Sequence, residues 1–108
     1  MKITLCGSTK FRTEYEEMNK VLSKRGHVVY SVSCFMHSGD TLTDEEKITL
    51  DLVHLKKILY SDFIFVIDKD EYVGESTRKE IQWAELNEKG ILYYSAYIKP
   101  DYFNVNGI

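Results

Sequence analysis

The chain has 108 residues, of which 44% are hydrophobic and 29% charged, a composition typical of one compact globular domain and not of a disordered or fibrous protein. Its formal net charge of −3, from 14 Lys and Arg against 17 Asp and Glu, excludes the broad cationic surface with which proteins bind polymeric nucleic acid. No apolar run approaches the roughly 20 residues needed to cross a bilayer, so we expect a single domain over residues 1–108 that is cytoplasmic and has no membrane partner.

The first part of the chain predicts two strands separated by an amphipathic helix. Residues 3–6 are typical of a short strand, which stops at the small-residue turn Gly7-Ser8-Thr9. Apolar side chains then recur at helical spacing, at Phe11, Tyr15, Met18 and Leu22. Residues 27–30 predict the second strand. The loop that follows carries His37, which could contact a base or a phosphate, although a lone loop histidine is usually just exposed.

The second part predicts two further helix and strand units. Thr43 and Glu46 match a capping box at the start of a helix that continues to Tyr60. We expect its sheet-facing stripe to consist of Ile48, Leu52, Leu55 and Leu59. Residues 63–67 are five consecutive apolar residues, typical of a strand buried on both faces. A third helix follows, which we expect Lys89-Gly90 to end, and residues 91–94 predict the fourth strand.

The alternation of strands and helices indicates an α/β fold with one doubly wound parallel sheet of strand order 2-1-3-4. The aromatic tail, residues 95–108, is compatible with a fifth edge strand or with packing on a partner subunit, and the sequence does not choose between them. The two cysteines, Cys6 and Cys34, make neither a disulfide framework nor a metal-ligand cluster. We therefore expect free thiols, no metal site and no cofactor.

Two segments lie where a parallel sheet binds its ligands, beyond the carboxyl ends of the strands. In Gly7-Ser8-Thr9, glycine allows close backbone approach and the hydroxyls can hold a phosphate or a ribose, although turns of this kind also need small residues for geometry alone. In Gly74-Glu75-Ser76-Thr77, at the start of the third helix, the same residue types equally suit an ordinary helix start.

Glu80 is the carboxylate best placed for chemistry. With Ile81 and Ala84 facing the sheet, Glu80 would lie on the boundary between core and crevice. Near a helix N-terminus such a carboxylate is expected to stay ionised and oriented, as a nucleophile must be, although helix-surface glutamates are also common. Asp51 on the second helix could point under a substrate, whereas we expect His54, one turn later, to be a surface residue.

Taken together, these segments resemble the nucleoside 2-deoxyribosyltransferase-like superfamily, which includes nucleoside transferases and 2′-deoxynucleoside 5′-monophosphate N-glycosidases. The resemblance covers roughly the first 95 residues and rests on Cys6-Gly7-Ser8, Asp51-Leu52, residues 61–67 and the Gly74…Glu80-Ile81…Ala84 element. The chain departs from the family pattern in two places. Tyr72-Val73 replaces an aspartate that the transferases usually carry before the glycine, and the stretch from Gly74 to Glu80 is longer than usual.

The resemblance implies a flavodoxin-like fold and cleavage or transfer of an N-glycosidic bond in a (deoxy)nucleoside or its 5′-monophosphate. It implies that Glu80 is the nucleophile that forms a covalent glycosyl-enzyme and that Asp51 is an acid lining the pocket. The substrate-binding residues that we expect are Gly7, Ser8, Thr9, Phe11, Gly74, Ser76 and Thr77, with Phe11 either stacking on the base or belonging to the core. The hydroxyls and Arg78 or Lys79 favour a 5′-phosphate. Because related enzymes commonly complete the pocket with a neighbouring subunit, a homodimer is expected.

Two other functions fit the sequence. Cys6, followed after five residues by Arg12 and Thr13, matches the cysteine-arginine loop of low-molecular-weight phosphotyrosine phosphatases, in which a thiolate attacks phosphorus. Lys10-Phe11 inside that loop and a vague general-acid candidate, Asp101, count against this function. The second alternative is a non-catalytic nucleotide-binding module that kept the pocket and lost turnover, which the missing aspartate at Tyr72 makes credible.

Overall fold

The computed structural model describes residues 1–35, 41–99 and 102–108, and within them the expected strands form one parallel sheet. The strands are β1 (Lys2–Gly7), β2 (Val28–Tyr30), β3 (Phe63–Ile67) and β4 (Gly90–Tyr93), in the order β2-β1-β3-β4. All three neighbouring pairs are parallel, and Gly7 lies opposite Ile67 where β1 and β3 end. The predicted α/β sheet of order 2-1-3-4 is confirmed. The described residues of the tail contain no fifth strand.

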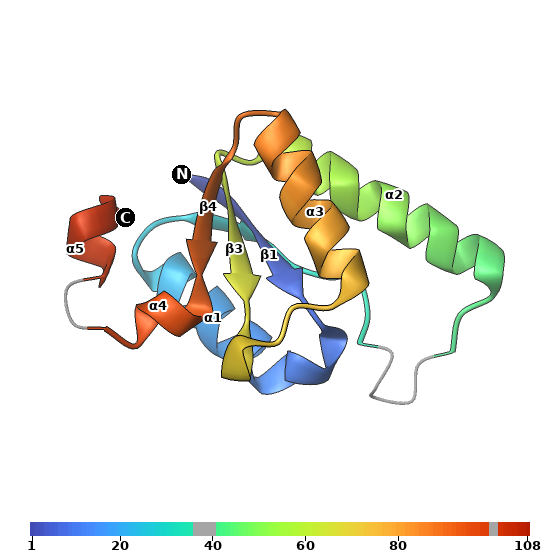
Figure 1. Cartoon of the computed structure of the whole chain (residues 1–108), viewed down its shortest axis with the longest axis horizontal. Coiled ribbons are helices and arrows are strands. Elements are labelled where there is room, and N and C mark those ends of the chain that lie inside the picture. Colours follow the sequence, from blue (N-terminus) through green and yellow to red (C-terminus); the bar gives the residue numbers. More distant parts are fainter. Residues whose placement is uncertain (36–40, 100–101) are drawn as a thin grey trace.

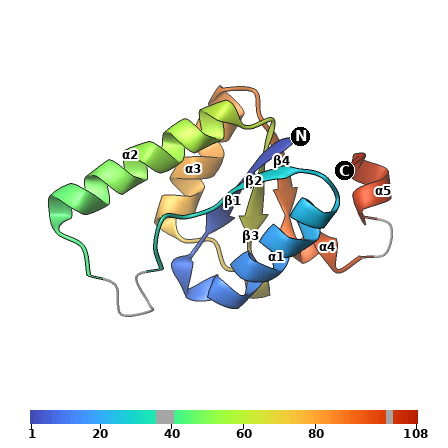
Figure 2. The same cartoon turned by 180° about the vertical axis from the view of Figure 1, so that it is seen from behind.

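Helices cover both faces of this sheet. They are η1 (Thr9–Phe11), α1 (Arg12–Lys24), α2 (Asp44–Tyr60), η3 (Lys69–Glu71), α3 (Glu75–Leu86), α4 (Tyr94–Tyr97) and α5 (Tyr102–Asn106). The two views show α2 and α3 together on one side of the sheet and α1 on the other (Figures 1 and 2). No helix in the part of the chain that the structure describes is long and apolar enough to span a membrane.

The apolar run of β3 is buried on both faces, as its sequence predicts, and β1 is also buried from Ile3 to Cys6. On the α1 side, strand residues pack with side chains of α1 in a cluster that includes Ile3, Leu5, Phe65, Ile67, Tyr15, Met18 and Leu22. On the opposite side a smaller cluster joins the sheet to α2 and α3 and contains Cys6, Ile64, Val66, Ile58 and Ala84. The side chain of Cys6 therefore points toward α2 and α3, because side chains alternate along a strand.

The start of α2 forms as predicted, but its buried stripe does not. The Thr43 hydroxyl accepts a hydrogen bond of 3.1 Å from the Glu46 N–H, and the Glu46 carboxylate accepts one of 2.9 Å from the Thr43 N–H. The predicted stripe is wrong, since Ile48, Leu52 and Leu59 are 60%, 55% and 40% exposed. The neighbouring stripe packs instead, with His54 and Ile58 buried. The periodicity pointed to one face of the helix, whereas packing against the sheet and α3 selected the neighbouring face.

The predicted end of the third helix is also wrong. Helix α3 ends at Leu86, and Glu88 then adopts a left-handed conformation with φ of 59°. Gly90 is the first residue of β4, and a Cβ atom there would lie 2.1 Å from a ring carbon of Phe63 on β3. This glycine is needed for a close approach between neighbouring strands and not as a helix cap.

The tail folds back onto the domain as short helices. The Asp68 carboxylate, buried at the end of β3, accepts hydrogen bonds of 2.8 Å from the Ser95 N–H and 2.7 Å from the Ser95 hydroxyl. The Tyr102 hydroxyl accepts a hydrogen bond of 3.0 Å from the Tyr93 N–H. Aromatic residues of α4 and α5, together with Ile108, join the core cluster on the α1 side.

Gly7→Ala is expected to destabilise the protein by about 2–4 kcal/mol. Gly7 has φ of 143°, and an added Cβ would lie 2.8 Å from the backbone oxygen of Ile67. Urea denaturation measures the loss. Gly26→Ala is the matched control, because Gly26 has φ of 92° but no atom within 4 Å of the added Cβ. Equal losses in the two variants would contradict the steric argument.

Candidate active site

A cavity of about 440 Å³ opens at the carboxyl edge of the sheet, a volume typical of small-molecule sites. It is bordered by the turn after β1, the segment after β2, helix α2 and the start of α3. Of the predicted site residues, it is lined by Gly7, Ser8, Thr9, Asp51, Gly74, Ser76, Thr77 and Glu80. Segments far apart in the sequence thus meet around one hollow.

The turn after β1 is held in place by local contacts. Gly7 has a φ that side chains rarely adopt, and its carbonyl accepts a hydrogen bond of 2.8 Å from the Tyr15 hydroxyl. The Ser8 hydroxyl caps η1 by accepting a hydrogen bond of 3.3 Å from the Lys10 N–H. These contacts fix the turn so that Ser8 and Thr9 border the cavity.

The start of α3 presents polar groups to the same cavity. Gly74 is the N-cap and provides no side-chain hydrogen bond to the first turn. The first N–H groups of a helix have no acceptor within it, so they can bind an anion. Ser76 and Thr77 add hydroxyls at this end, with Ser76 exposed and Thr77 buried. The cavity therefore has a polar region suited to a phosphate or to sugar hydroxyls.

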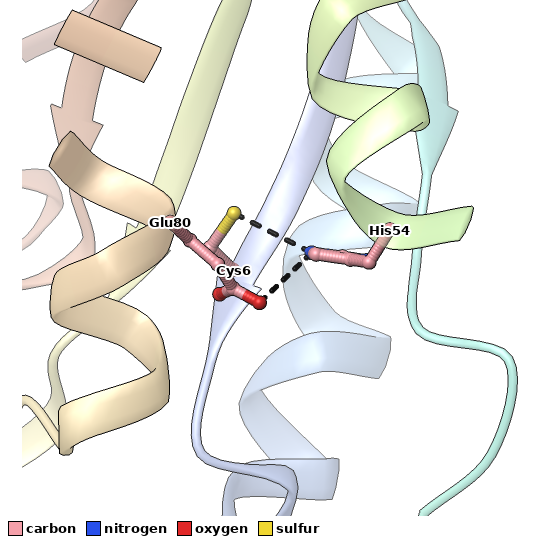
Figure 3. A group of neighbouring side chains, drawn as sticks. All are labelled: Cys6, His54 and Glu80. Carbon is pink, nitrogen blue, oxygen red and sulfur yellow. Dashed lines mark hydrogen bonds and ion pairs between the residues drawn. The ribbon is translucent and has the colours of Figure 1, made fainter. Parts of the chain in front are cut away.

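Three side chains from three elements meet beside the cavity, two of them, His54 and Glu80, in its wall (Figure 3). Glu80 of α3 places a carboxylate oxygen 3.7 Å from Nε2 of His54 on α2. The same Nε2 atom lies 3.5 Å from Sγ of Cys6 at the end of β1. Cys6 and His54 are only 0% and 7% exposed, whereas the Glu80 side chain keeps 20% of its surface accessible. The Glu80 side chain therefore packs beside Cys6 and His54 and is accessible from the cavity.

Burial, and after it the negative charge of Asp51, raise the pKa of Glu80 to about 7, although a hydrogen bond with the Cys6 thiol acts in the opposite direction. The expectation that the helix N-terminus keeps this carboxylate fully ionised is corrected, because desolvation outweighs that effect. Burial also lowers the pKa of His54 to about 4. His54 is thus neutral at pH 7, and its approach to Glu80 is a contact between polar atoms and not an ion pair.

Three of the remaining predicted residues do not line the cavity. Phe11 is 8% exposed and belongs to the core, where its ring meets Tyr72 edge-on, so it does not line the cavity. Arg78 and Lys79 do not line it either, whereas Lys47 does. His37 and Asp101 lie outside the described residues.

His54 is the functional candidate that sequence reasoning missed. It was expected on the surface, yet it is buried between β1 and α3. One signal could have indicated it, because Leu50, His54 and Ile58 form a second stripe at spacings of four residues. Tyr72 is also in the wall, at the position where the family aspartate is missing.

The structure gives Cys6 an environment opposite to that of a phosphatase nucleophile. Burial raises the pKa of the Cys6 thiol well above its usual value, and the charge of Glu80 raises it further. A catalytic thiolate needs a lowered pKa and an electropositive loop. The Arg12 guanidinium lies 3.0 Å from the Glu16 carboxylate and faces the ring of Phe35. Cys6 is therefore a buried strand-end thiol, and both cysteines are free.

Comparison with known proteins gives a clear result for the fold. No protein-family model and no curated protein sequence matches the chain. Among solved structures it is similar to a 2-deoxyribosyltransferase of Bacillus psychrosaccharolyticus, with a TM-score of 0.65 and 18% identity over 86% of this chain and 71% of that one. The chain has the 2-deoxyribosyltransferase fold. The CMP N-glycosidase BcmB of Clostridium botulinum shares this fold, with a TM-score of 0.56 and 18% identity over 86% of this chain and 70% of that one.

The predicted resemblance to the nucleoside 2-deoxyribosyltransferase-like superfamily is therefore confirmed as structural similarity. Both neighbours act on nucleosides or nucleotides, as their names state. At this identity the comparison concerns the 2-deoxyribosyltransferase fold alone.

Proposed function

We propose that this protein cleaves or transfers the N-glycosidic bond of a (deoxy)nucleoside 5′-monophosphate or the corresponding nucleoside, through a covalent glycosyl-enzyme on Glu80. The single observation that carries the proposal is the position of the Glu80 carboxylate. It is buried against Cys6 and His54 and reaches a cavity of about 440 Å³ that hydroxyl-bearing turns also line. The shared fold of the two N-glycosidic-bond enzymes supports this reaction class.

In the proposed reaction, a Glu80 oxygen forms a bond to the anomeric carbon of the sugar. The bond from that carbon to the base breaks, and its electron pair leaves with the base, which takes up a proton. Water or a second base then attacks the same carbon, which frees Glu80 and retains the configuration. The negative charge of Asp51, close enough to raise the pKa of Glu80, would also favour the positive charge that builds on the sugar.

A 5′-phosphate fits the polar end of the cavity. Ser8, Thr9, Ser76 and Thr77 supply hydroxyls there, and the uncapped N-terminus of α3 supplies N–H groups. Lys47 adds a cation to the wall. Because a phosphate carries negative charge, these groups favour the nucleotide over the nucleoside.

The test is to incubate the protein with a panel of ribo- and deoxynucleosides and their 5′-monophosphates and to measure free base by chromatography. We expect release from at least one deoxynucleotide, and faster release from 5′-monophosphates than from nucleosides. Adding a second, free base distinguishes transfer from hydrolysis, since a transferase makes a new nucleotide whereas a hydrolase leaves free sugar phosphate. Absence of both base release and a glycosyl adduct across the panel would refute the proposal.

Ser76→Ala is expected to raise KM for a 5′-monophosphate about tenfold or more, because a hydrogen bond to a charged group is lost. The unphosphorylated nucleoside is the internal control, and its KM should change little. Steady-state kinetics with the two substrates measure the ratio. Equal changes for both would show that Ser76 does not contact the phosphate.

The homodimer and the cytoplasmic location stay proposals. Exposed apolar residues on α2, including Ile48 and Leu52, flank the cavity residues Leu50 and Asp51. A second copy covering this helix would bury apolar surface next to the site, in line with the expectation that a neighbouring subunit completes the pocket.

A further inference from the structure

Beside the cavity, Glu80 belongs to a set of metal-ligand atoms whose other two members, Cys6 and His54, have no role in the proposed glycosidic reaction. Sγ of Cys6, a ring nitrogen of His54 and a carboxylate oxygen of Glu80 all lie within 4.8 Å of one another. They come from β1, α2 and α3, so the packing of two helices on the sheet fixes their relative positions (Figure 3). Cys6 and His54 are almost fully buried.

We propose that Cys6, His54 and Glu80 bind a zinc ion whose fourth coordination position faces the cavity. A thiolate, an imidazole and a carboxylate are the three ligand types that zinc accepts in proteins, and three protein ligands with one open position are typical of accessible zinc sites. His54 and Glu80 line the cavity, so water can reach that fourth position.

Two of the three ligand spacings fit tetrahedral coordination. Zinc bonds of about 2.0–2.3 Å at tetrahedral angles separate neighbouring ligand atoms by about 3.4–3.6 Å. The Cys6 to His54 distance is 3.5 Å, and the His54 to Glu80 distance is 3.7 Å. The third pair, Sγ of Cys6 and the Glu80 carboxylate, lies within 4.8 Å and has to close up to complete the three-ligand set.

The ligand chemistry selects the ion. Mg²⁺ and Ca²⁺ prefer sets of oxygen ligands, whereas a sulfur and nitrogen pair favours zinc. Binding exchanges protons and involves no redox step. The zinc to sulfur bond replaces the S–H bond of Cys6, any proton on Glu80 is displaced in the same way, and the released protons pass to solvent.

Zinc at this position would occupy the carboxylate that attacks the sugar. Zinc and substrate would therefore exclude each other, and this consequence rests on the proposed function, whereas zinc binding itself does not. The site would then make the activity depend on the free zinc concentration.

The experiment titrates the metal-free full chain with Co²⁺, used as a spectroscopic probe for zinc. We expect one equivalent to bind with a sulfur-to-cobalt charge-transfer band and the visible bands of tetrahedral cobalt, and Zn²⁺ to displace it. Cys6→Ser should abolish the charge-transfer band. His54→Gln should weaken metal binding at least about 100-fold. Even the loss of a residue that only hydrogen-bonds to a metal ligand lowers metal affinity about 10–100-fold.

Matched controls use the other cysteine, Cys34, which lines the cavity, and His27, which does not. Cys34→Ser and His27→Gln should keep both the band and the affinity, and circular dichroism should show that every variant is folded. Absence of the sulfur band in the parent chain, or its loss in Cys34→Ser and not in Cys6→Ser, would overturn the zinc site. If the metal-free protein binds added zinc but releases no base from any substrate, the proposed function is refuted and the zinc site is retained.

Discussion

Glu80→Gln is expected to lower base release from deoxynucleotides by at least about 10³-fold, a loss typical of removing a nucleophile. Glutamine keeps the size and much of the hydrogen bonding of glutamate, but its amide does not form the glycosyl ester. Single-turnover experiments with chromatographic detection of the base measure the effect. Glu85→Gln, on an exposed face of the same helix, is the matched control and should retain activity.

The stability of Glu80→Gln gives an independent check that the variant is folded. Because the pKa of Glu80 is raised to about 7, the folded protein retains a proton that the unfolded chain releases near 4.5. The stability from this group is fully present below about pH 4.5 and is lost as pH rises through 7. Glutamine removes that loss, so we expect the variant to be more stable than the parent at pH 8, by up to about 3 kcal/mol.

Three outcomes of the Glu80 experiment distinguish the functions considered. Loss of base release with retained nucleotide binding supports the glycosyl-enzyme. Activity that survives Glu80→Gln and disappears in Cys6→Ser would refute it and restore the cysteine-dependent alternative. Nucleotide binding by the parent chain with no base release from any substrate would instead identify a binding module.

The pH dependence of kcat/KM should show one acidic limb with an apparent pKa near 7. Glu80 attacks only as a carboxylate, and its pKa is raised to about 7. Activity should fall about tenfold per pH unit below that value, so pH 5 should give about 100-fold less than pH 8. The pKa of His54, about 4, places its protonation below this range. The profile is measured with a chelator present.

Asp51→Asn tests the cause of the raised pKa. Removing the negative charge of Asp51 should move the acidic limb to lower pH, because that charge opposes ionisation of Glu80. The direction of this shift is independent of any loss in rate that Asp51 causes as a site residue. A limb that stays in place, or moves to higher pH, would show that the charge of Asp51 does not act on Glu80.

Features that depend only on neighbouring residues, such as a buried strand, a helix cap or a turn, were predicted correctly. The buried strand at residues 63–67, the capping box of Thr43 and Glu46, and the turn after β1 all form as predicted. The predictions failed where a choice depended on packing partners. The end of α3 and the role of Gly90 depend on how closely Phe63 approaches across the sheet.

The sequence by itself determined the α/β alternation and the segments that border the cavity, because hydrophobic period, caps and turns act within a few residues of one another. The sheet order followed from the usual connections between parallel strands. Only the tertiary structure decided which face of α2 meets the sheet. That choice buries His54 and brings it to Cys6, 48 residues away in the chain, and to Glu80. The raised pKa of Glu80 has the same origin, since desolvation and the charge of Asp51 act through space and not along the sequence.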